Sequence, residues 1–234
     1  MKEISISRRR FIGASTAVFG AAALAGPATS LLAAAQAATP VASGAASPVP
    51  GAGPLGGQIK MAYNTPATLN PLFSTTGTDQ GAEREIYGAL VMMTDGLDPE
   101  MDLAESVDVT PDGKEYTFHL RKTNVFTDGV PLTSKDVMFT FTRAIDPRTA
   151  SVWRSRFLAL EGADKYDGTT VTDIPGLQAP DDYTVKMTLA KPDATWLITL
   201  CDFAGFCILP EHAFGSIPPD QLQKAPFSLQ PGPS

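Results

Sequence analysis

The chain has 234 residues, of which 43% are hydrophobic and 18% are charged, and its formal net charge is -7. This hydrophobic content is enough to build a core in one or two globular domains. The four basic residues and one Glu of residues 1–37 contribute +3, so the rest of the chain carries -10. That charge argues against nucleic acid or an anionic membrane surface as a partner.

Residues 1–37 have the composition of an export signal. A basic start precedes an uncharged run of small and apolar residues, and Ala35-Gln36-Ala37 has the small-x-small arrangement that a signal peptidase accepts. The segment SRRRFI at residues 7–12 resembles a twin-arginine signal. We therefore expect export by the twin-arginine machinery and a periplasmic or extracellular mature protein. An uncleaved anchor over residues 11–38 is the alternative, because that length just spans a bilayer.

Two further features belong to this region. No Cys lies near the expected cleavage point, so a lipoprotein is not indicated. Residues 38–57 are rich in Pro, Gly, Ala and Ser, carry no charge and have almost no large side chain. Such a segment buries too little surface to offset the entropy of its own ordering, and it is typical of a flexible linker. The folded part is expected to begin near Gln58.

The first elements expected after the linker are a strand and a helix. Residues 58–64, QIKMAYN, suggest a short strand. Residues 77–93 are expected to be helical and to end near Asp95-Gly96, because four apolar residues recur on one side at helical spacing. These are Ala82, Ile86, Leu90 and Met93.

Alternating residues then predict a hairpin over residues 106–122, with its turn at Pro111-Asp112-Gly113. Tyr116, Phe118 and Leu120 face one way in that pattern. Thr117 and His119 face the other, and His119 is expected to be solvated. The same logic applies to residues 179–193, in which Val185, Met187 and Leu189 alternate after an Asp-rich turn. Residues 194–200 predict a short helix and residues 203–209 a buried strand.

The most patterned stretch is residues 125–147, VFTDGVPLTSKDVMFTFTRAIDP. Asp128-Gly129 predicts a turn, and Thr133 is expected to cap a helix in which Asp136 completes a capping box. Asp146-Pro147 ends the helix, since the residue before a proline avoids the helical region. The expected inner face consists of Val137, Phe141, Ala144 and Ile145. The stretch has no residue suited to nucleophilic chemistry.

Two cysteines and a histidine near the end of the chain are the remaining candidates for chemistry. A cysteine hydrolase would need Cys201 or Cys207 beside His212. The apolar setting of Cys207 argues against this, because burial raises a thiol pKa. A metal site of these three residues lacks the paired short spacings of a metal knuckle. A Cys201–Cys207 disulfide stays open, since spacing alone does not show that the two Cβ atoms face each other.

Four segments in this order resemble the extracytoplasmic solute-binding proteins of ABC importers, in family 5, which includes the dipeptide, oligopeptide and nickel binders. They are LNPLFS at 69–74, EYTFHLRKTNVFTDGVPLTSKDVMFTFTRAIDP at 115–147, APDDYTVKMTLAKPDATWLITL at 179–200 and DFAGFCILPEHAF at 202–214. The resemblance covers residues 58–222, and its middle block is the most specific part.

The resemblance implies a periplasmic-binding-protein-like type II fold of the α/β class. The family has two ligand-gripping lobes and an accessory α+β domain. Residues 58–75 then correspond to the opening of the first lobe, residues 76–185 to the accessory domain and residues 186–234 to an incomplete return to the first lobe. We expect a truncated form without the second lobe, and therefore weak ligand binding by these residues alone.

The resemblance also implies a function and a set of contacts. The expected ligand is a small peptide or similar solute, the expected partners are ABC permease subunits, and neither an enzymatic activity, a cofactor nor a metal is expected. Residues of the loop after the first strand and of a second segment near the same wall would contact the ligand: Phe73, Ser74, Thr75, Phe203, Ala204 and Gly205. For Phe73 the alternative is a core position, and for Ser74 and Thr75 it is a helix cap. The alternative for the whole chain is an exported, non-enzymatic protein-interaction module with an exposed apolar patch.

Overall fold

The computed structural model describes residues 64–94, 96, 98–201 and 206–228. The strand expected over residues 58–64 lies almost wholly outside this range. The export signal lies wholly outside it. None of the helices in the described part is long and apolar enough to cross a membrane.

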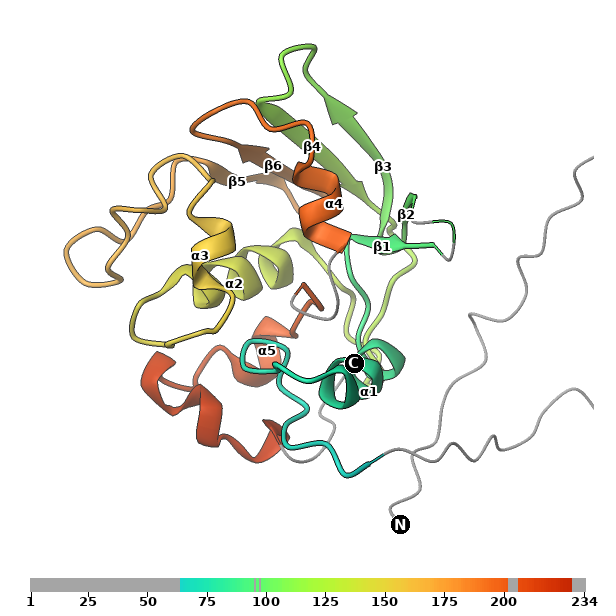
Figure 1. The fold of residues 1–234 in the computed structure, drawn as a ribbon, viewed down its shortest axis with the longest axis vertical. Helices are drawn as coiled ribbons and strands as arrows, with labels where there is room; N and C mark the ends of the chain where they lie inside the picture. Colours follow the sequence, from blue (N-terminus) through green and yellow to red (C-terminus); the bar gives the residue numbers. More distant parts are fainter. Residues whose placement is uncertain (1–63, 95, 97, 202–205, 229–234) are drawn as a thin grey trace, which may run out of the picture. The chain divides into compact units, whose positions relative to one another are not determined.

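A four-stranded antiparallel sheet forms the centre of the described part, and its strands lie in the order β3-β4-β6-β5 (Figure 1). Alternate residues of its two central strands point into the core and are buried, including Tyr116, Phe118 and Met187. The two predicted hairpins are therefore confirmed. The strands are β3 (Ala104–Val109), β4 (Glu115–Leu120), β5 (Leu177–Asp181) and β6 (Thr184–Thr188).

Helices pack around this sheet, and a second, two-stranded sheet joins β1 to β2. In Figure 1, α2 and α3 lie under the four-stranded sheet, and α1 and α5 lie further from it. The remaining elements are α1 (Gly77–Ile86), β1 (Val91–Met93), β2 (Pro99–Met101), α2 (Ser134–Ile145), α3 (Arg154–Phe157), α4 (Trp196–Cys201), α5 (Glu211–Phe214) and the 3-10 helices η2 (Pro219–Lys224) and η3 (Pro226–Ser228). The boundary expected between residues 185 and 186 falls inside β6, and the predicted domain division stays a prediction.

Helix α2 has the inner face that its sequence predicts, because Val137, Phe141, Ala144 and Ile145 are all buried. Phe141 packs edge-on against Phe157 of α3, with ring centroids 4.9 Å apart. Phe157 in turn packs edge-on against Phe206 at 4.4 Å and Trp196 at 6.4 Å. Four aromatic rings thus connect α2, α3, α4 and the chain just before α5.

The capping box at the start of α2 is also present. The Thr133 hydroxyl accepts a hydrogen bond from the backbone N–H of Lys135 at 3.3 Å, and the Thr133 N–H donates to the Asp136 carboxylate at 2.8 Å. The other oxygen of Asp136 accepts from the backbone N–H of Glu211 at 2.8 Å. One buried carboxylate therefore caps α2 and holds the start of α5, a tertiary contact that the capping pattern does not predict.

The helix expected over residues 77–93 is wrong in its second half. Helix α1 ends at Ile86, Tyr87 has an extended backbone, and residues 91–93 form β1. The reason is tertiary: β1 pairs with β2, and the Ile208 N–H donates to the Gly88 carbonyl at 2.8 Å. Gly88 lies so close to Leu103 that a Cβ would come within 2.7 Å of that side chain. Pairing and close packing override the helical periodicity here.

The strand expected over residues 203–209 is only partly present. Cys207 makes an isolated bridge with Ala89, and the Leu209 N–H donates to the Thr140 hydroxyl at 2.9 Å. Residues 206–209 are buried, as expected, but they form no regular strand. Residues 203–205 lie outside the described residues.

Replacing Phe141 with Ala is expected to lower the free energy of unfolding by about 3–5 kcal/mol, because the ring is 1% exposed and leaves a cavity. Urea unfolding of the purified chain measures the change. Phe139→Ala is the matched control, since Phe139 lies half-buried on the outer face of the same helix and is expected to cost less. Equal costs for the two variants would contradict the assignment of the inner face.

Thr133→Ala is expected to cost about 1 kcal/mol through the lost helix cap. The same unfolding experiment measures it, with Thr123→Ala at an exposed position as the control that should change stability little. A Thr133→Ala variant as stable as the control would show that the Asp136 carboxylate alone is a sufficient cap.

Candidate functional site

The segment before the predicted ligand loop is anchored to the last elements described. The Leu69 N–H donates to the Ser228 carbonyl at 2.7 Å, and the Asn70 side-chain amide donates to the Leu222 carbonyl at 3.2 Å. Asn70 is fully buried, and its amide oxygen accepts from the Leu72 N–H at 3.1 Å. Residues 69–72 and 222–228 therefore lie side by side, although about 150 residues of sequence separate them.

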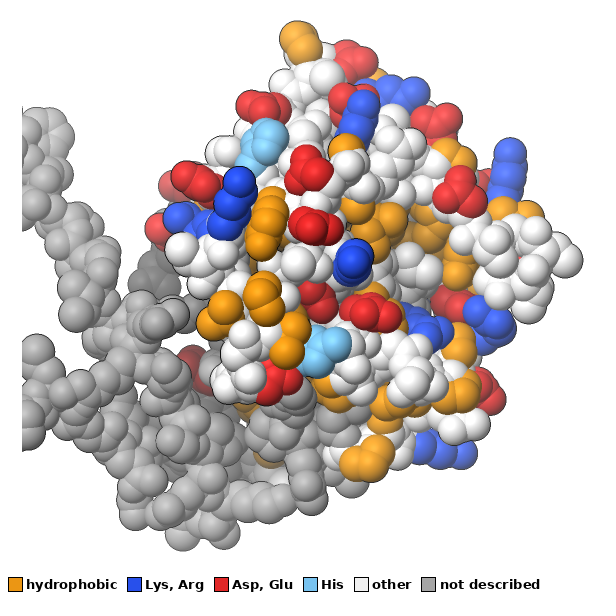
Figure 2. Space-filling view, turned by 180° about the vertical axis from the view of Figure 1, so that it is seen from behind, with side chains coloured by type: hydrophobic (Ala, Val, Ile, Leu, Met, Phe, Trp, Pro, Cys, Tyr) orange, Lys and Arg blue, Asp and Glu red, His pale blue; other side chains and the backbone are white. Residues whose placement is uncertain are grey.

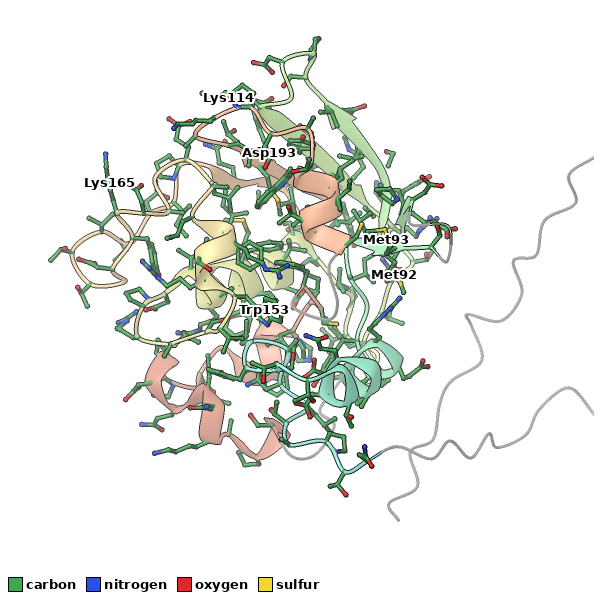
Figure 3. The ribbon with its side chains drawn as sticks, viewed as in Figure 1. Met92, Met93, Lys114, Trp153, Lys165 and Asp193 are labelled. Atoms are coloured by element: carbon green, nitrogen blue, oxygen red, sulfur yellow. The ribbon has the colours of Figure 1, made fainter. Side chains whose placement is uncertain are left out.

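The α3 region fixes the same segment from another side. The indole N–H of Trp153 donates to the Pro71 carbonyl at 2.9 Å, and the Ser151 hydroxyl donates to the Leu72 carbonyl at 2.8 Å. Figure 3 shows Trp153 between α3 and the chain that leads into α1. The backbone that enters the predicted ligand loop is thus held by donors from residues distant in sequence.

The predicted loop itself is only partly exposed. Phe73 is 8% exposed and Ser74 is fully buried, whereas Thr75 lies on the surface. The helix cap is Thr76, whose hydroxyl accepts from the Asp79 N–H at 3.2 Å, so neither Ser74 nor Thr75 caps α1. The role of these residues in ligand binding stays a prediction. Phe203, Ala204 and Gly205 lie outside the described residues.

A functional candidate that the sequence analysis missed is Glu83 on α1. The side chain is fully buried, and neither carboxyl oxygen has a hydrogen-bond partner. Burial raises the pKa of Glu83 from 4.5 to about 8; the nearby Ser74 hydroxyl opposes that shift and Asp79 adds to it. The Ser74 hydroxyl also lies 3.5 Å from the Pro71 carbonyl, to which it donates. The sequence signal was the position of Glu83 on the apolar side of α1, beside Ala82.

The cysteine and histidine candidates do not form a site. Cys201 and Cys207 are both buried and are not joined by a disulfide, and burial raises the pKa of the Cys201 thiol to about 11. His212 is instead paired with Asp128 at 2.8 Å and packs beside the Phe126 ring. His212 lies in the first turn of α5. No base is thus shown beside a nucleophilic thiol, and a cysteine hydrolase has no support in these contacts.

The charged side chains of the described residues are not gathered into a metal site. Within the described ranges there is no group of three or more His, Cys, Asp or Glu side chains that is placed to hold a metal ion. Acidic and basic side chains are interspersed on the face shown in Figure 2. His119 lies on the polar side of β4, as expected, and pairs with Asp108 at 2.9 Å.

A shallow hollow of about 530 Å³ lies on the outer face of α2. Arg143 at its edge donates to the carbonyls of Gly215 and Ile217, both at 3.2 Å, and lies over the Phe139 ring. This guanidinium is therefore already engaged in holding the chain after α5. The lining residues are Lys135, Met138, Phe139, Thr142, Arg143, Tyr166, Glu211 and Gly215.

Comparison with known proteins identifies the class. Residues 98–226, more than half of the chain, match the family model described as bacterial extracellular solute-binding proteins, family 5 Middle. A putative ABC transporter peptide-binding protein of Brucella ovis is 35% identical over 182 residues, which are 77% of this chain and 31% of the relative. The periplasmic oligopeptide-binding protein of Escherichia coli is 37% identical over 119 residues, 49% of this chain and 21% of that protein.

Solved structures agree with these relatives. The substrate-binding domain of an oligopeptide ABC transporter from Bacillus anthracis superposes with a TM-score of 0.60 at 26% identity, covering 65% of this chain and 30% of that one. A periplasmic oligopeptide-binding protein of Borrelia burgdorferi gives a TM-score of 0.61 at 26% identity, covering 68% and 32%. The fold is thus that of the solute-binding proteins of ABC importers.

The chain belongs to the bacterial extracellular solute-binding proteins of family 5. The resemblance drawn from the four sequence segments and the periplasmic-binding-protein-like fold class are both confirmed. The chain spans about 31% of the length of the Brucella relatives. Members of this family are transport proteins rather than enzymes.

The buried carboxyl of Glu83 makes stability depend on pH. Its folded pKa of about 8 exceeds the ordinary 4.5, so between these values the unfolded state loses the proton and the folded state keeps it. Each pKa unit corresponds to about 1.4 kcal/mol. Because of Glu83, the free energy of unfolding is therefore expected to fall by roughly 5 kcal/mol as the pH rises from 4.5 to 8. Glu83→Gln should remove that loss, and urea unfolding at several pH values measures it.

Glu85→Gln is the matched control, because Glu85 is exposed on the same helix. This variant should keep the pH dependence of the parent chain. If Glu83→Gln gave the same decline in stability as the parent between pH 4.5 and 8, the raised pKa of Glu83 in the folded protein would be contradicted.

Proposed function

We propose that the chain supplies one wall of a solute-binding site for an ABC importer, with a small peptide or similar solute as ligand. The observation that carries the proposal is the family match over residues 98–226, together with relatives that are described as peptide-binding proteins. One relative at 31% identity is described as a probable deoxycholate-binding protein, so the solute class extends beyond peptides in related chains.

In this proposal the loop at residues 73–75 meets the ligand, with Thr75 as its exposed contact, and the sheet domain is scaffold. Thr75 is exposed at the end of a segment that is held at Asn70, Pro71 and Leu72 by distant donors. A rigidly held backbone favours binding because less conformational freedom is lost when the ligand arrives. Phe203, Ala204 and Gly205 are proposed to line the same wall, and permease subunits are the proposed protein partners.

The proposed location is the periplasm or the extracellular side, and it draws support from relatives described as periplasmic. The twin-arginine export route rests on residues 7–12 alone. Replacing Arg8 and Arg9 by Lys is expected to leave the precursor inside the cell, because the export machinery recognises the arginine pair. Cell fractionation and blotting measure this, and unchanged export of the Lys variant would contradict the twin-arginine route.

Binding is tested on the 234-residue chain by nuclear magnetic resonance titration with trialanine. A single wall leaves much of the ligand in water, so an affinity of about millimolar is expected rather than micromolar. Amide shifts should move at residues 73–75 and stay unchanged at Thr117 and Lys186, on the polar side of the sheet. Thr75→Ala should weaken binding, with Thr123→Ala as the control. Shifts that avoid residues 73–75, or no saturable shift, would contradict the proposed wall.

A further inference from the structure

The hollow on the outer face of α2 is lined by residue types that are enriched at protein interfaces. Its lining includes Met138, Phe139, Arg143 and Tyr166. Aromatic residues, Met and Arg are over-represented at the core of such interfaces, where they supply contact area and directed hydrogen bonds. Met138 and Phe139 are only half-buried, so part of their apolar surface is exposed to solvent in this chain.

The walls of the hollow are held in place without a partner. Helix α5 is tied to α2 at its start, where the Glu211 N–H donates to the Asp136 carboxylate at 2.8 Å. It is tied again just after its end, where Nη2 of Arg143 donates to the Gly215 carbonyl at 3.2 Å. The hollow is therefore already formed in the free chain, and a ligand enters it without any displacement of the fold. A pre-formed site loses little conformational freedom on binding.

The lining of the hollow has an excess of positive charge. It contains two cations, Lys135 and Arg143, and one anion, Glu211. The Lys135 ammonium group makes no ion pair or hydrogen bond with any residue that the structure describes. Arg143 binds both of its carbonyls through Nη2 alone. This local positive charge contrasts with the charge of -10 over residues 38–234, and the partner that complements it is acidic.

The spacing of the two cations favours one pattern of partner residues. Lys135 and Arg143 are eight positions apart on α2, which is about 12 Å at a rise of about 1.5 Å per residue. An extended chain covers that distance in about four residues, and its first, third and fifth side chains point to the same side. Carboxylates at the first and fifth positions then reach the two cations. The third side chain meets Phe139, which lies midway between them in the helix.

We propose that this hollow binds an extended segment of a partner protein that has acidic residues at its first and fifth positions and an apolar residue at its third. Lys135 and Arg143 pair with the two carboxylates, and the apolar side chain packs on Met138 and Phe139. The inference goes beyond the proposed solute wall and does not depend on it, because the hollow shares no residue with the loop at residues 73–75.

Nuclear magnetic resonance titration of the full chain with a blocked pentapeptide tests the proposal. The probe has glutamate at its first and fifth positions, leucine at the third and serine at the other two. The control peptide has glutamine in place of both glutamates. Amide shifts are expected at residues 135–143 and 211–215. The glutamate peptide is expected to bind about tenfold more tightly, since two partly exposed ion pairs together contribute about that factor. No saturable shift at these residues, or equal affinity of the two peptides, would overturn the proposal.

Single substitutions separate the charges from the apolar contact. Lys135→Gln should reduce the preference for the glutamate peptide to about threefold, and Glu211→Gln should raise the affinity for it because a like charge is removed. Phe139→Ala should weaken both peptides by the same factor. Lys191→Gln is the matched control, since Lys191 is exposed after β6 and does not line the hollow. If Lys191→Gln lost as much preference as Lys135→Gln, the attraction would be general to the chain and the proposed site would be wrong.

A second copy of this chain is the other occupant to test. Sedimentation velocity of the chain alone, over a range of concentrations, is expected to show a monomer, and Lys135→Gln is expected to sediment in the same way. A concentration-dependent dimer that Lys135→Gln abolishes would assign the hollow to contact between copies and overturn the proposal of a separate acidic partner.

Discussion

Four packed aromatic rings, Phe141, Phe157, Trp196 and Phe206, hold together parts of the chain that the sequence separates widely. Their edge-to-face contacts at 4.4 to 6.4 Å join α2, α3, α4 and the segment before α5. Such contacts contribute beyond the burial of the rings themselves. Because α3 is held here, Ser151 and Trp153 are in position to donate to the chain at residues 71–72. The geometry of the proposed ligand wall therefore depends on this cluster.

The cluster and the proposed wall have opposite chemical character. The aromatic contacts are apolar, whereas α1, next to the proposed wall, carries Glu83, whose carboxyl is fully buried near Ser74. Burial of that group lowers stability above its ordinary pKa, and the packed core has to offset the cost.

Local patterns predicted much of the scaffold. The hairpins, the inner face of α2 and its capping box depend on residues close in sequence, and all were predicted correctly. The end of α1 was not, because the pairing of β1 with β2 and the packing of Gly88 involve distant residues. The same limit applies to Asp136, because a capping motif does not predict that its carboxylate accepts a hydrogen bond from the Glu211 N–H. Glu83 was missed although its helical position beside Ala82 was a usable signal.

The most direct measurement of the central claim is a crystal structure of the 234-residue chain with trialanine bound. The account predicts peptide density against residues 73–75. Peptide density confined to the hollow along the outer face of α2, between Lys135 and Arg143, would contradict it. That result would place the solute on the domain that is here assigned as scaffold.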